Sequence, residues 1–464
     1  MKRALLLSTF ILPAAMAAMT APAQAACNVN STPITCSGVS TGFTRNSDYN
    51  NLDIQVQTGA VVTRGSTDTI RIRGNGNTVT NNGTIIGDGA NNEDDRTDAI
   101  DGGNDLTVYN YGSIDASNMG VDGRENLTVY NYGSINALNK GIDAELETGL
   151  EVYNYGSITA VSKGIRNQDG TNARLENYGL IESETHEGFE SGDNAYVYNA
   201  EGASIIGSDD AIQVGENAEI HNHGLIHSVA RGGDEENPQD GIDIDSGYIH
   251  NYATGVILSD DDAAIDYDGS DITSYIDNYG TISGTTGVLV EKGETGEEPN
   301  VAGQIIRNWG LIEGRDGLAL DLGAGDDSLT LYAGSRLIGG ADFGADNDSL
   351  ILDGIFGEDI AGGALLDGGT GLNDVTFLNY GIGDIVASLF DDELAVVLSF
   401  ASDESTFSIN LANWTSFTFA DGATYSYAAL QDALDVPAAV PVPAAGLLML
   451  GGLAGLAALR RRRA

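Results

Sequence analysis

The chain has 464 residues and carries 68 Asp and Glu against 21 Lys and Arg, for a formal net charge of −47. Such a surface repels nucleic-acid phosphates and anionic lipid headgroups, which excludes nucleic-acid binding and argues against binding to a membrane surface. Because 41% of the residues are hydrophobic, the chain is no disordered acidic tail, and we expect a folded protein rich in glycine and β-forming residues.

Residues 1–25 have the features of a secretory signal peptide. A basic start at Lys2 and Arg3 is followed by an apolar run over residues 4–18 and by the small-residue pattern Ala-Gln-Ala at 23–25. This order predicts cleavage after residue 25 and export from the cytoplasm. The mature chain is then expected to begin at Ala26.

Residues 26–70 are expected to cap the first end of the fold. Cys27 and Cys36 are the only cysteines, and an exported chain enters an oxidising compartment, so we expect a local disulfide between them. Two free thiols are the alternative. Lipidation of Cys27 is a further alternative, although Gln24 occupies the position where a lipid-modified cysteine wants leucine.

A repeat dominates the middle of the chain. The phrase Val-Tyr-Asn-Tyr-Gly-Ser-Ile occurs at 108–114, 129–135 and 152–158, with degenerate copies on both sides. Most spacings between the repeated asparagines are 21 to 23 residues, and the longer ones contain polar insertions that we expect to be loops. The asparagines are Asn81, Asn110, Asn131, Asn154, Asn177, Asn199, Asn222, Asn251, Asn278 and Asn308.

Three short alternating apolar segments in each repeat predict three β-strands per coil. Stacked in register, such coils form an all-β parallel β-helix, which we place at residues 71–375. The third apolar column is Ile100, Val121, Ile142, Ile165, Phe189, Ile212, Ile242, Ile265, Val288 and Leu318.

The asparagines are expected to point inward and to form a structural ladder, because stacked amides satisfy one another where they are buried. The residues that follow them are mostly aromatic and are expected to stack on the outer face. They are Tyr111, Tyr132, Tyr155, Tyr178, His223, Tyr252, Tyr279 and Trp309. A carbohydrate-binding stripe is the alternative interpretation of this column, because aromatic faces also suit sugar rings.

A column of aspartates follows the third apolar column. Its members are Asp101, Asp122, Asp143, Asp243 and Asp266. Without the two terminal segments the chain has 15 basic and 68 acidic residues, a charge of −53. Carboxylates stacked about 4.8 Å apart repel one another, so we expect this column to be solvated or to bind cations such as Ca²⁺.

The repeats, followed by Leu-Asp-Leu-Gly-Ala-Gly-Asp-Asp-Ser-Leu at 320–329, resemble the passenger domains of autotransporter adhesins and related surface β-helix proteins over about residues 70–375. The resemblance implies a right-handed helix and a structural or adhesive role. Autotransporters also carry a translocating barrel, whereas 29 residues follow Asp435, so we do not expect self-translocation.

Three glycine-aspartate segments, at 323–329, 344–350 and 368–375, resemble the calcium-binding RTX nonapeptide. The resemblance implies Ca²⁺ at Asp327 and Asp348. The copies are 21 and 25 residues apart rather than nine, so solvated turns are the alternative. We expect no other cofactor.

Paired acids at 209–210 and 260–262 are the only catalytic candidates, and pectinase-type motifs are absent from the sequence. Four histidines lie around two coils. We expect them to replace aromatic residues in the stacked outer columns, and a transition-metal site is the alternative. They are His221, His223, His227 and His250. We do not expect this protein to be an enzyme.

Residues 376–435 are expected to cap the second end, with a short helix near residues 425–434. A linker at 436–443 leads to a transmembrane or sorting helix at 444–459 and a basic tail at 460–464. The motif Val440-Pro441-Val442-Pro443-Ala444, the apolar span and the arginines together resemble the VPLPA-type sorting signal, a relative of the PEP-CTERM signals, with Val442 in place of the family's leucine.

That resemblance implies an exosortase-like sorting protease as a partner and a Gram-negative cell envelope, surface or extracellular matrix as the location. The sequence therefore predicts an exported, acidic, structural or adhesive β-helix protein, which has matrix polysaccharide as a further possible partner. The alternative is a polysaccharide-active lyase or hydrolase on the same scaffold.

Overall fold

The computed structural model describes residues 26–435 except 90–96, 145–147, 231–238, 291–299, 357–363, 391–394 and 402–405. The signal peptide, the linker with residues 440–444, the segment 444–459 and the basic tail lie outside the described residues. No helix within the described part is both long and apolar enough to cross a bilayer.

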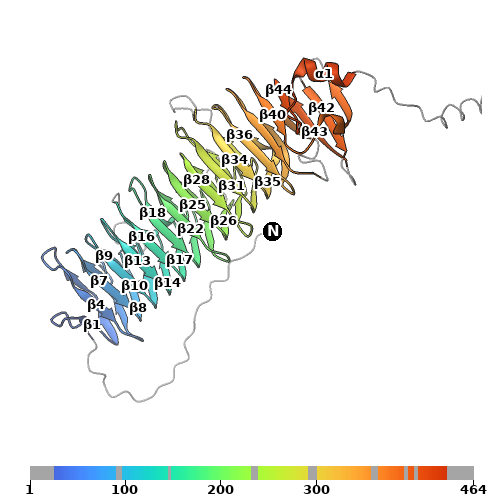
Figure 1. Cartoon of the computed structure of the whole chain (residues 1–464). Coiled ribbons are helices and arrows are strands. Elements are labelled where there is room, and N and C mark those ends of the chain that lie inside the picture. Colours follow the sequence, from blue (N-terminus) through green and yellow to red (C-terminus); the bar gives the residue numbers. More distant parts are fainter. Residues whose placement is uncertain are drawn as a thin grey trace, which may run out of the picture. The chain divides into compact units, whose positions relative to one another are not determined.

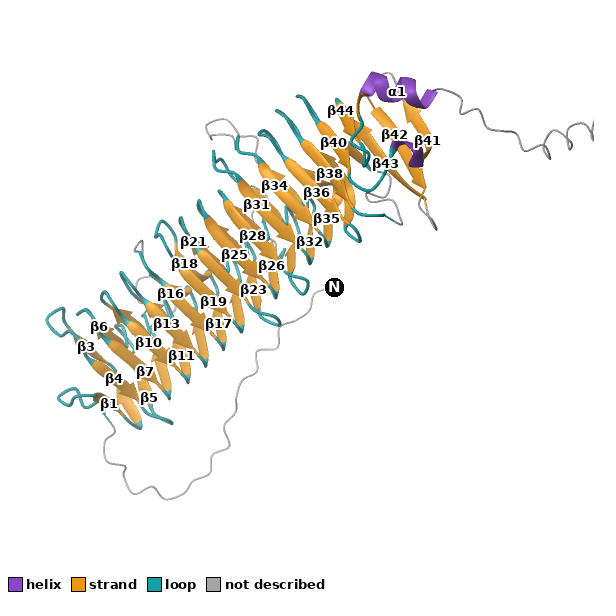
Figure 2. Ribbon diagram, in the orientation of Figure 1, coloured by secondary structure: helices purple, strands orange, loops and turns teal. Residues whose placement is uncertain are grey.

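The chain divides into two compact units, residues 1–174 with 179–182, and residues 175–178 with 183–464. Each is a parallel β-solenoid, with about 13 turns in all and almost no helix (Figures 1 and 2). The all-β parallel fold predicted from the repeat is therefore confirmed. The division into two units has no counterpart in the repeat pattern.

In the first unit each coil contributes three short strands. The first column is β1 (Ile34–Cys36), β4 (Asp53–Val56), β7 (Thr78–Asn81), β10 (Thr107–Asn110), β13 (Thr128–Asn131) and β16 (Glu151–Asn154). The second is β2 (Val39–Thr41), β5 (Val61–Thr63), β8 (Thr84–Gly87), β11 (Ser113–Ala116), β14 (Ser134–Ala137) and β17 (Ser157–Ala160). The third is β3 (Phe43–Arg45), β6 (Ile70–Ile72), β9 (Ile100–Gly102), β12 (Val121–Asp122), β15 (Lys140–Asp143) and β18 (Lys163–Asn167).

Identical positions of neighbouring coils are paired in the core of this unit. Val108 lies opposite Val129, and Ile114 lies opposite Ile135, all of them fully buried. The β-branched residues therefore fill the interior in continuous columns, which suits their packing on a pleated surface.

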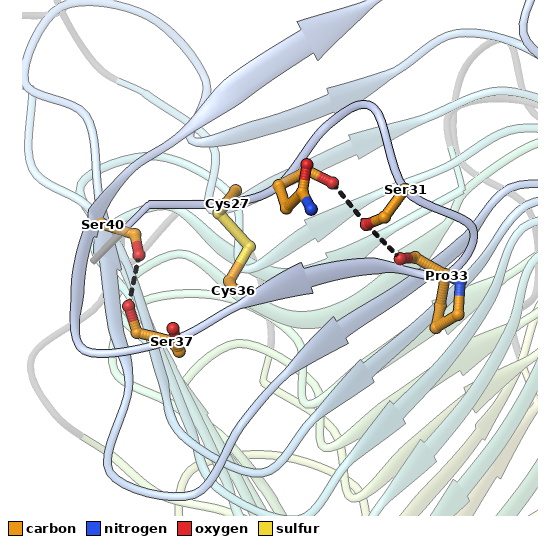
Figure 3. The surroundings of a disulfide bond; sticks show 7 residues. Cys27, Ser31, Pro33, Cys36, Ser37 and Ser40 are labelled. Carbon is orange, nitrogen blue, oxygen red and sulfur yellow. Dashed lines mark hydrogen bonds between the residues drawn. A yellow bond between two sulfur atoms is a disulfide. The ribbon is translucent and has the colours of Figure 1, made fainter. Parts of the chain in front are cut away.

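The solenoid begins earlier than predicted. Parallel pairing already joins Ile34 to Ile54 and Phe43 to Ile70, within the segment 26–70 that the sequence assigns to a cap. Apolar spacing is present there, but the asparagine and tyrosine that mark later coils are missing, so the repeat is not visible. The disulfide between Cys27 and Cys36 lies at this end, where Ser31 Oγ donates to the carbonyls of Asn28 and Pro33 (Figure 3).

Strands β19 (Arg174–Asn177) and β20 (Leu180–Ser183) fall where the units divide. In the second unit the first column is β22 (Tyr196–Asn199), β25 (Ala218–Asn222), β28 (Gly247–Asn251), β31 (Ser274–Asn278), β34 (Gln304–Asn308), β36 (Ser328–Tyr332), β38 (Ser349–Asp353) and β40 (Asp374–Phe377). The second is β23 (Ser204–Gly207), β26 (Leu225–Ser228), β29 (Val256–Ser259), β32 (Thr281–Gly284), and the starts of β35 (Leu311–Asp321) and β37 (Arg336–Asp342). The third is β21 (Phe189–Ser191), β24 (Ile212–Val214), β27 (Ile242–Ile244), β30 (Ile265–Tyr267), β33 (Val288–Val290), the ends of β35 and β37, and β39 (Leu365–Asp367).

The third apolar column corrects one prediction. Val288 pairs with Leu320, not with Leu318, and Leu318 is 37% exposed. A register shift in β35 after Glu313 moves the inward position by two residues. The repeat spacing alone cannot reveal this irregularity.

The second unit ends in an antiparallel cap (Figure 2). It comprises the 3-10 turn η2 (Ile382–Asp384), β41 (Ile385–Phe390), β42 (Ala395–Ala401), β43 (Thr406–Ala412), β44 (Ser416–Thr418), β45 (Thr424–Ser426) and α1 (Tyr427–Asp435). Strand β42 pairs antiparallel with β41 and β43, and its inward residues Leu398 and Phe400 are fully buried. The short helix lies close to its predicted place.

Candidate functional site

The repeated asparagines form a hydrogen-bonded ladder inside the coils. In the first unit Asn110 Nδ2 donates to Asn131 Oδ1 at 2.8 Å and to the carbonyl of Ser134 at 3.0 Å, and Asn131 repeats this pattern with Asn154 and Ser157. In the second unit the same contacts run through Asn177, Asn199, Asn222, Asn251, Asn278 and Asn308. All are fully buried, so this ladder holds coils together and presents no amide to a ligand.

A second ladder, absent from the sequence predictions, contains the two proposed calcium ligands. Asp327 Oδ1 accepts the backbone N–H of Gln304 at 2.6 Å, Asp348 Oδ1 accepts that of Asp327 at 2.9 Å, and Asn373 Oδ1 accepts that of Asp348 at 2.9 Å. The repeat spacing contains a signal for this ladder, because each of the three side chains directly precedes a first-column strand, β36, β38 or β40. The sequence instead predicted calcium ligands at Asp327 and Asp348, or solvated turns.

Burial changes the chemistry of this ladder. Asp327 and Asp348 are each 1% exposed, and their Oδ2 atoms have no hydrogen-bond partner. Burial raises the pKa of Asp327 to about 8 and that of Asp348 to about 7, against the effect of the backbone N–H donors. The structure thus aligns both carboxyls in the coil interior, and the described residues contain no group of three or more Asp, Glu, His or Cys arranged to hold a metal.

The aromatic columns of the first unit form two parallel stacks. Tyr109, Tyr130 and Tyr153 stack with ring centroids 5.0 and 4.8 Å apart. The neighbouring Tyr111, Tyr132 and Tyr155 stack at 4.9 Å with rings within 4° of parallel, and they are 44 to 51% exposed. Because each ring covers the flat face of the next, the surface presents ring edges and hydroxyls, which does not suit a stripe that binds sugars through ring faces.

Histidines interrupt the corresponding stack in the second unit. His223 stacks on Tyr252 at 3.6 Å, His250 stacks on Tyr279 at 5.3 Å, and Tyr279 continues to Trp309 at 4.3 Å. His221 and His250 occupy equivalent positions of adjacent strands, as the repeat indicates. Burial lowers the pKa values of His223 and His250, so the stack contains neutral imidazoles at neutral pH.

Two members of the aspartate column in the first unit lie beside basic side chains of the same chain. Asp101 and Asp143 are 0 and 1% exposed, so the expectation of a solvated column is wrong here. Arg73 lies 2.6 Å and Arg71 lies 3.1 Å from Asp101, while Lys140 lies 2.6 Å from Asp143. The prediction considered the acids alone and missed Lys140 on the same strand as Asp143, and Arg71 and Arg73 in the coil before Asp101.

Two acids of the second unit, Asp210 and Asp243, accept hydrogen bonds from a backbone N–H and from an amide side chain. Asp240 donates its backbone N–H to Asp210 Oδ1 at 2.8 Å. Burial raises the pKa of both carboxyls well above the ordinary value, and the charge of Asp243 adds to the shift at Asp210 while those of Asp266 and Asp210 add to it at Asp240. Asp243 and Asp266 lie in register on adjacent strands, and Gln213 Nε2 donates to Asp243 at 2.9 Å.

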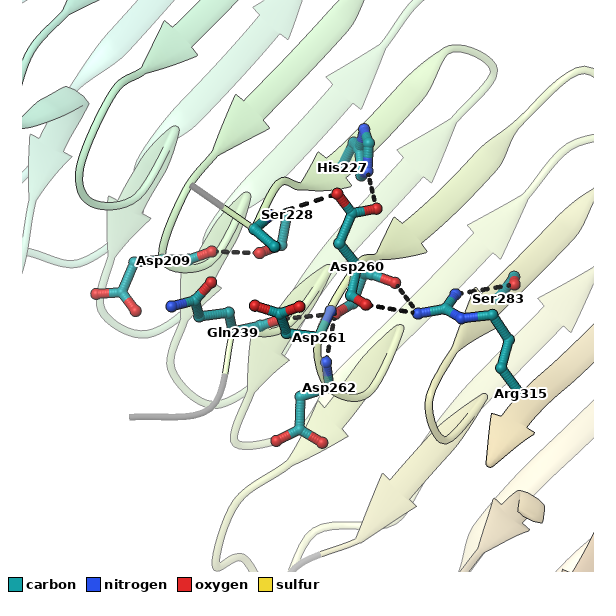
Figure 4. A network of polar contacts seen from close by, with 11 residues as sticks. Asp209, His227, Ser228, Gln239, Asp260, Asp261, Asp262, Ser283 and Arg315 are labelled. Carbon is teal, nitrogen blue, oxygen red and sulfur yellow. Dashed lines mark hydrogen bonds and ion pairs between the residues drawn. The ribbon is translucent and has the colours of Figure 1, made fainter. Parts of the chain in front are cut away.

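A histidine contacts a carboxylate of the acid cluster at 260–262 in the second unit (Figure 4). His227 Nε2 is 3.0 Å from Asp260 Oδ1, and Asp260 Oδ2 accepts the backbone N–H of Ala230. Nearby, Arg315 Nη2 donates to the carbonyls of Ser259 and Asp260 at 2.7 and 2.9 Å. The structure therefore places a histidine beside one of the predicted acid clusters, a pairing that sequence spacing did not indicate.

No family model matches this chain, and the comparisons with curated proteins and with solved structures found no match.

Proposed function

We propose that this chain is an exported, acidic protein of the cell surface or extracellular matrix of a Gram-negative bacterium, with a structural or adhesive role. The observation that carries the proposal is that its repeated side chains contact their own counterparts in the next coil. Buried asparagine stacks on asparagine and exposed tyrosine stacks on tyrosine. Side chains used in this way build a scaffold and an extended surface rather than a site for one small substrate.

Export and sorting belong to the same proposal. The disulfide between Cys27 and Cys36 supports export, because disulfides persist in oxidising compartments. The signal-like start, and the tail that resembles a sorting signal with a transmembrane segment at 444–459, support processing by an exosortase-like protease. The right-handed winding of the coils rests on the resemblance to surface β-helix passengers.

The adhesive partner in this proposal is polysaccharide or another matrix component. The exposed edges of Tyr111, Tyr132 and Tyr155 offer a row of phenolic hydroxyls about one coil apart. Hydroxyl rows of this kind form hydrogen bonds with polymers that have a short repeat.

Cell fractionation combined with mass spectrometry of both mature termini tests the proposal. We expect the protein in the envelope or matrix fraction, beginning at Ala26 and lacking the arginines at 460–463. An intact carboxy-terminal peptide in surface material would contradict sorting. Recovery from the cytoplasm with residues 1–25 attached would contradict export.

A polysaccharide-active enzyme is the second candidate, favoured by the contact between His227 and Asp260. A lyase or hydrolase should release unsaturated products or reducing ends from acidic or neutral polysaccharides. Activity that is lost in both His227→Ala and Asp260→Asn, and kept in the matched surface variant His186→Ala, would establish this candidate. Equal turnover by all three variants would exclude these two residues from catalysis.

A further inference from the structure

The two ends of the described chain carry opposite kinds of charge. Residues 26–75 contain four basic and three acidic residues, a net charge of +1 in a chain of −47. Residues 376–435 contain nine acidic residues and no basic one, a net charge of −9. Within the described residues, the end where the coils begin is therefore nearly neutral, and the cap is strongly acidic.

Two arginines at the beginning of the coils are not used in ion pairs. Arg45 Nη2 donates to the carbonyl of Val29 at 2.7 Å, and Arg64 Nη1 donates to Thr44 Oγ1 at 2.8 Å. Neither contacts a carboxylate of the described residues, in contrast to Arg71 and Arg73, which lie in the same coil as Arg64. Their charge is available to an acidic partner.

The same end has an open strand edge. Strand β2 pairs with β5 and β3 pairs with β6, and no described strand lies on the other side of β2 or β3. Together they present residues 39–45 at the edge, with Val39 73% exposed. Unpaired backbone groups of this kind bind a further strand readily.

The cap has a second open edge, formed by β41. This strand has the sequence Ile-Val-Ala-Ser-Leu-Phe, pairs with β42 on one side, and has no described strand on the other (Figure 2). Val386 is 59% and Leu389 is 70% exposed. Natural proteins protect edge strands with charged residues, yet charges occur only beside β41, at Asp384 and at 391–393.

We propose that β41 of one copy pairs with the β2–β3 edge of a second copy, so that the chains join head to tail. Strand β41 has six residues, and the β2–β3 edge has seven. The β2–β3 edge contains Arg45 and no acid, whereas Asp384 and the acids at 391–393 flank the apolar β41. Pairing β41 with β41 of another copy would instead oppose Asp384 and the acids at 391–393, and like charges destabilise strand pairs. A head-to-tail contact uses a different surface on each partner, so every added copy offers a further free edge, and the contact generates open chains or closed rings of copies.

The inference does not depend on export or sorting, and sedimentation of the full-length protein tests it. We expect the mean mass of the wild type to rise with protein concentration and to fall with added salt, because the contact is partly electrostatic. A head variant, Val39→Glu/Arg64→Glu, and a tail variant, Val386→Lys/Leu389→Lys, should each sediment as a monomer.

Mixing the two variants provides the decisive measurement. Each retains one intact end, so a head-to-tail contact predicts that the mixture forms a dimer and nothing larger. The control variants Leu138→Glu and Leu372→Lys change exposed leucines away from both edges and should associate like the wild type. A monomeric wild type, a mixture that stays monomeric, or a tail variant that still associates would each overturn the proposal. Circular dichroism of every variant establishes that its solenoid is folded.

Discussion

Asn131 donates its side-chain amide to the side-chain carbonyl of Asn154 in the next coil, across 2.8 Å and with both side chains fully buried. Asn131 also accepts the corresponding bond from Asn110. Each rung is thus a donor to one neighbour and an acceptor from the other, and removal of one amide leaves polar groups of two coils without a partner.

Asn154→Leu should lower the free energy of unfolding by about 1 to 3 kcal/mol, because Asn131 loses its acceptor and the carbonyl of Leu180 loses its donor. Denaturant unfolding measures the effect. Tyr155→Ser is the matched control on the adjacent outward position, which is 44% exposed, and it should cost less. A larger loss for the tyrosine variant would contradict the assignment of inward and outward columns.

Asp327→Asn should stabilise the protein at alkaline pH. Burial raises the pKa of Asp327 to about 8, above an unfolded value of about 3.9, so the folded chain binds more protons between these values. The stabilisation that protonated Asp327 gives the folded state is therefore fully present below about pH 4 and is lost as the pH rises to about 8. Asparagine keeps the acceptor for Gln304 N–H without a charge, and should raise the free energy of unfolding at about pH 9 by about 1 to 3 kcal/mol.

Thermal melts of wild type and Asp327→Asn at pH 5 and pH 9 measure this difference. Asp326→Asn, on the neighbouring exposed residue, is the control and should change the pH dependence much less, because the charge of Asp326 is a smaller cause of the raised pKa of Asp327 than burial is. A pH dependence that is identical in wild type and Asp327→Asn would show that Asp327 is not protonated in the fold.

Arg73→Met should destabilise the first unit by about 1 to 3 kcal/mol near pH 8.5, because buried Asp101 loses the closer of its two arginine partners. Burial raises the pKa of Asp101 to about 7, so the loss should shrink below about pH 6, where this carboxyl is protonated. The double variant Arg73→Met/Asp101→Asn should recover part of the stability. Additive losses in the double variant would mean that the two side chains do not interact.

The repeat revealed the fold because a parallel solenoid places equivalent residues in direct contact. The spacing of Asn110, Asn131 and Asn154 sets the register, and alternation around them determines the buried face. Where a coil lacks these markers, as at Ile34 and Ile54, the pattern is too weak to predict it.

The candidate sites were harder to predict, because they depend on how deep a side chain lies. Asp327 and Asp101 both follow or precede glycine-rich turns in acidic sequence, which indicates solvent exposure. In the structure one is buried as a hydrogen-bond acceptor and the other lies between two arginines. Periodicity gives the column to which a residue belongs, whereas burial depends on the loops and long side chains that cover that column.

The asparagine ladder also determines how this protein can change in length during evolution. Asn110, Asn131 and Asn154 have the same donor, the same acceptor and the same carbonyl contact, so one coil can replace another at this position. Duplication or loss of one repeat of 21 to 23 residues restores every one of these bonds, whereas a partial repeat takes the next asparagine out of register with the ladder. Selection can therefore lengthen or shorten the solenoid only in whole coils.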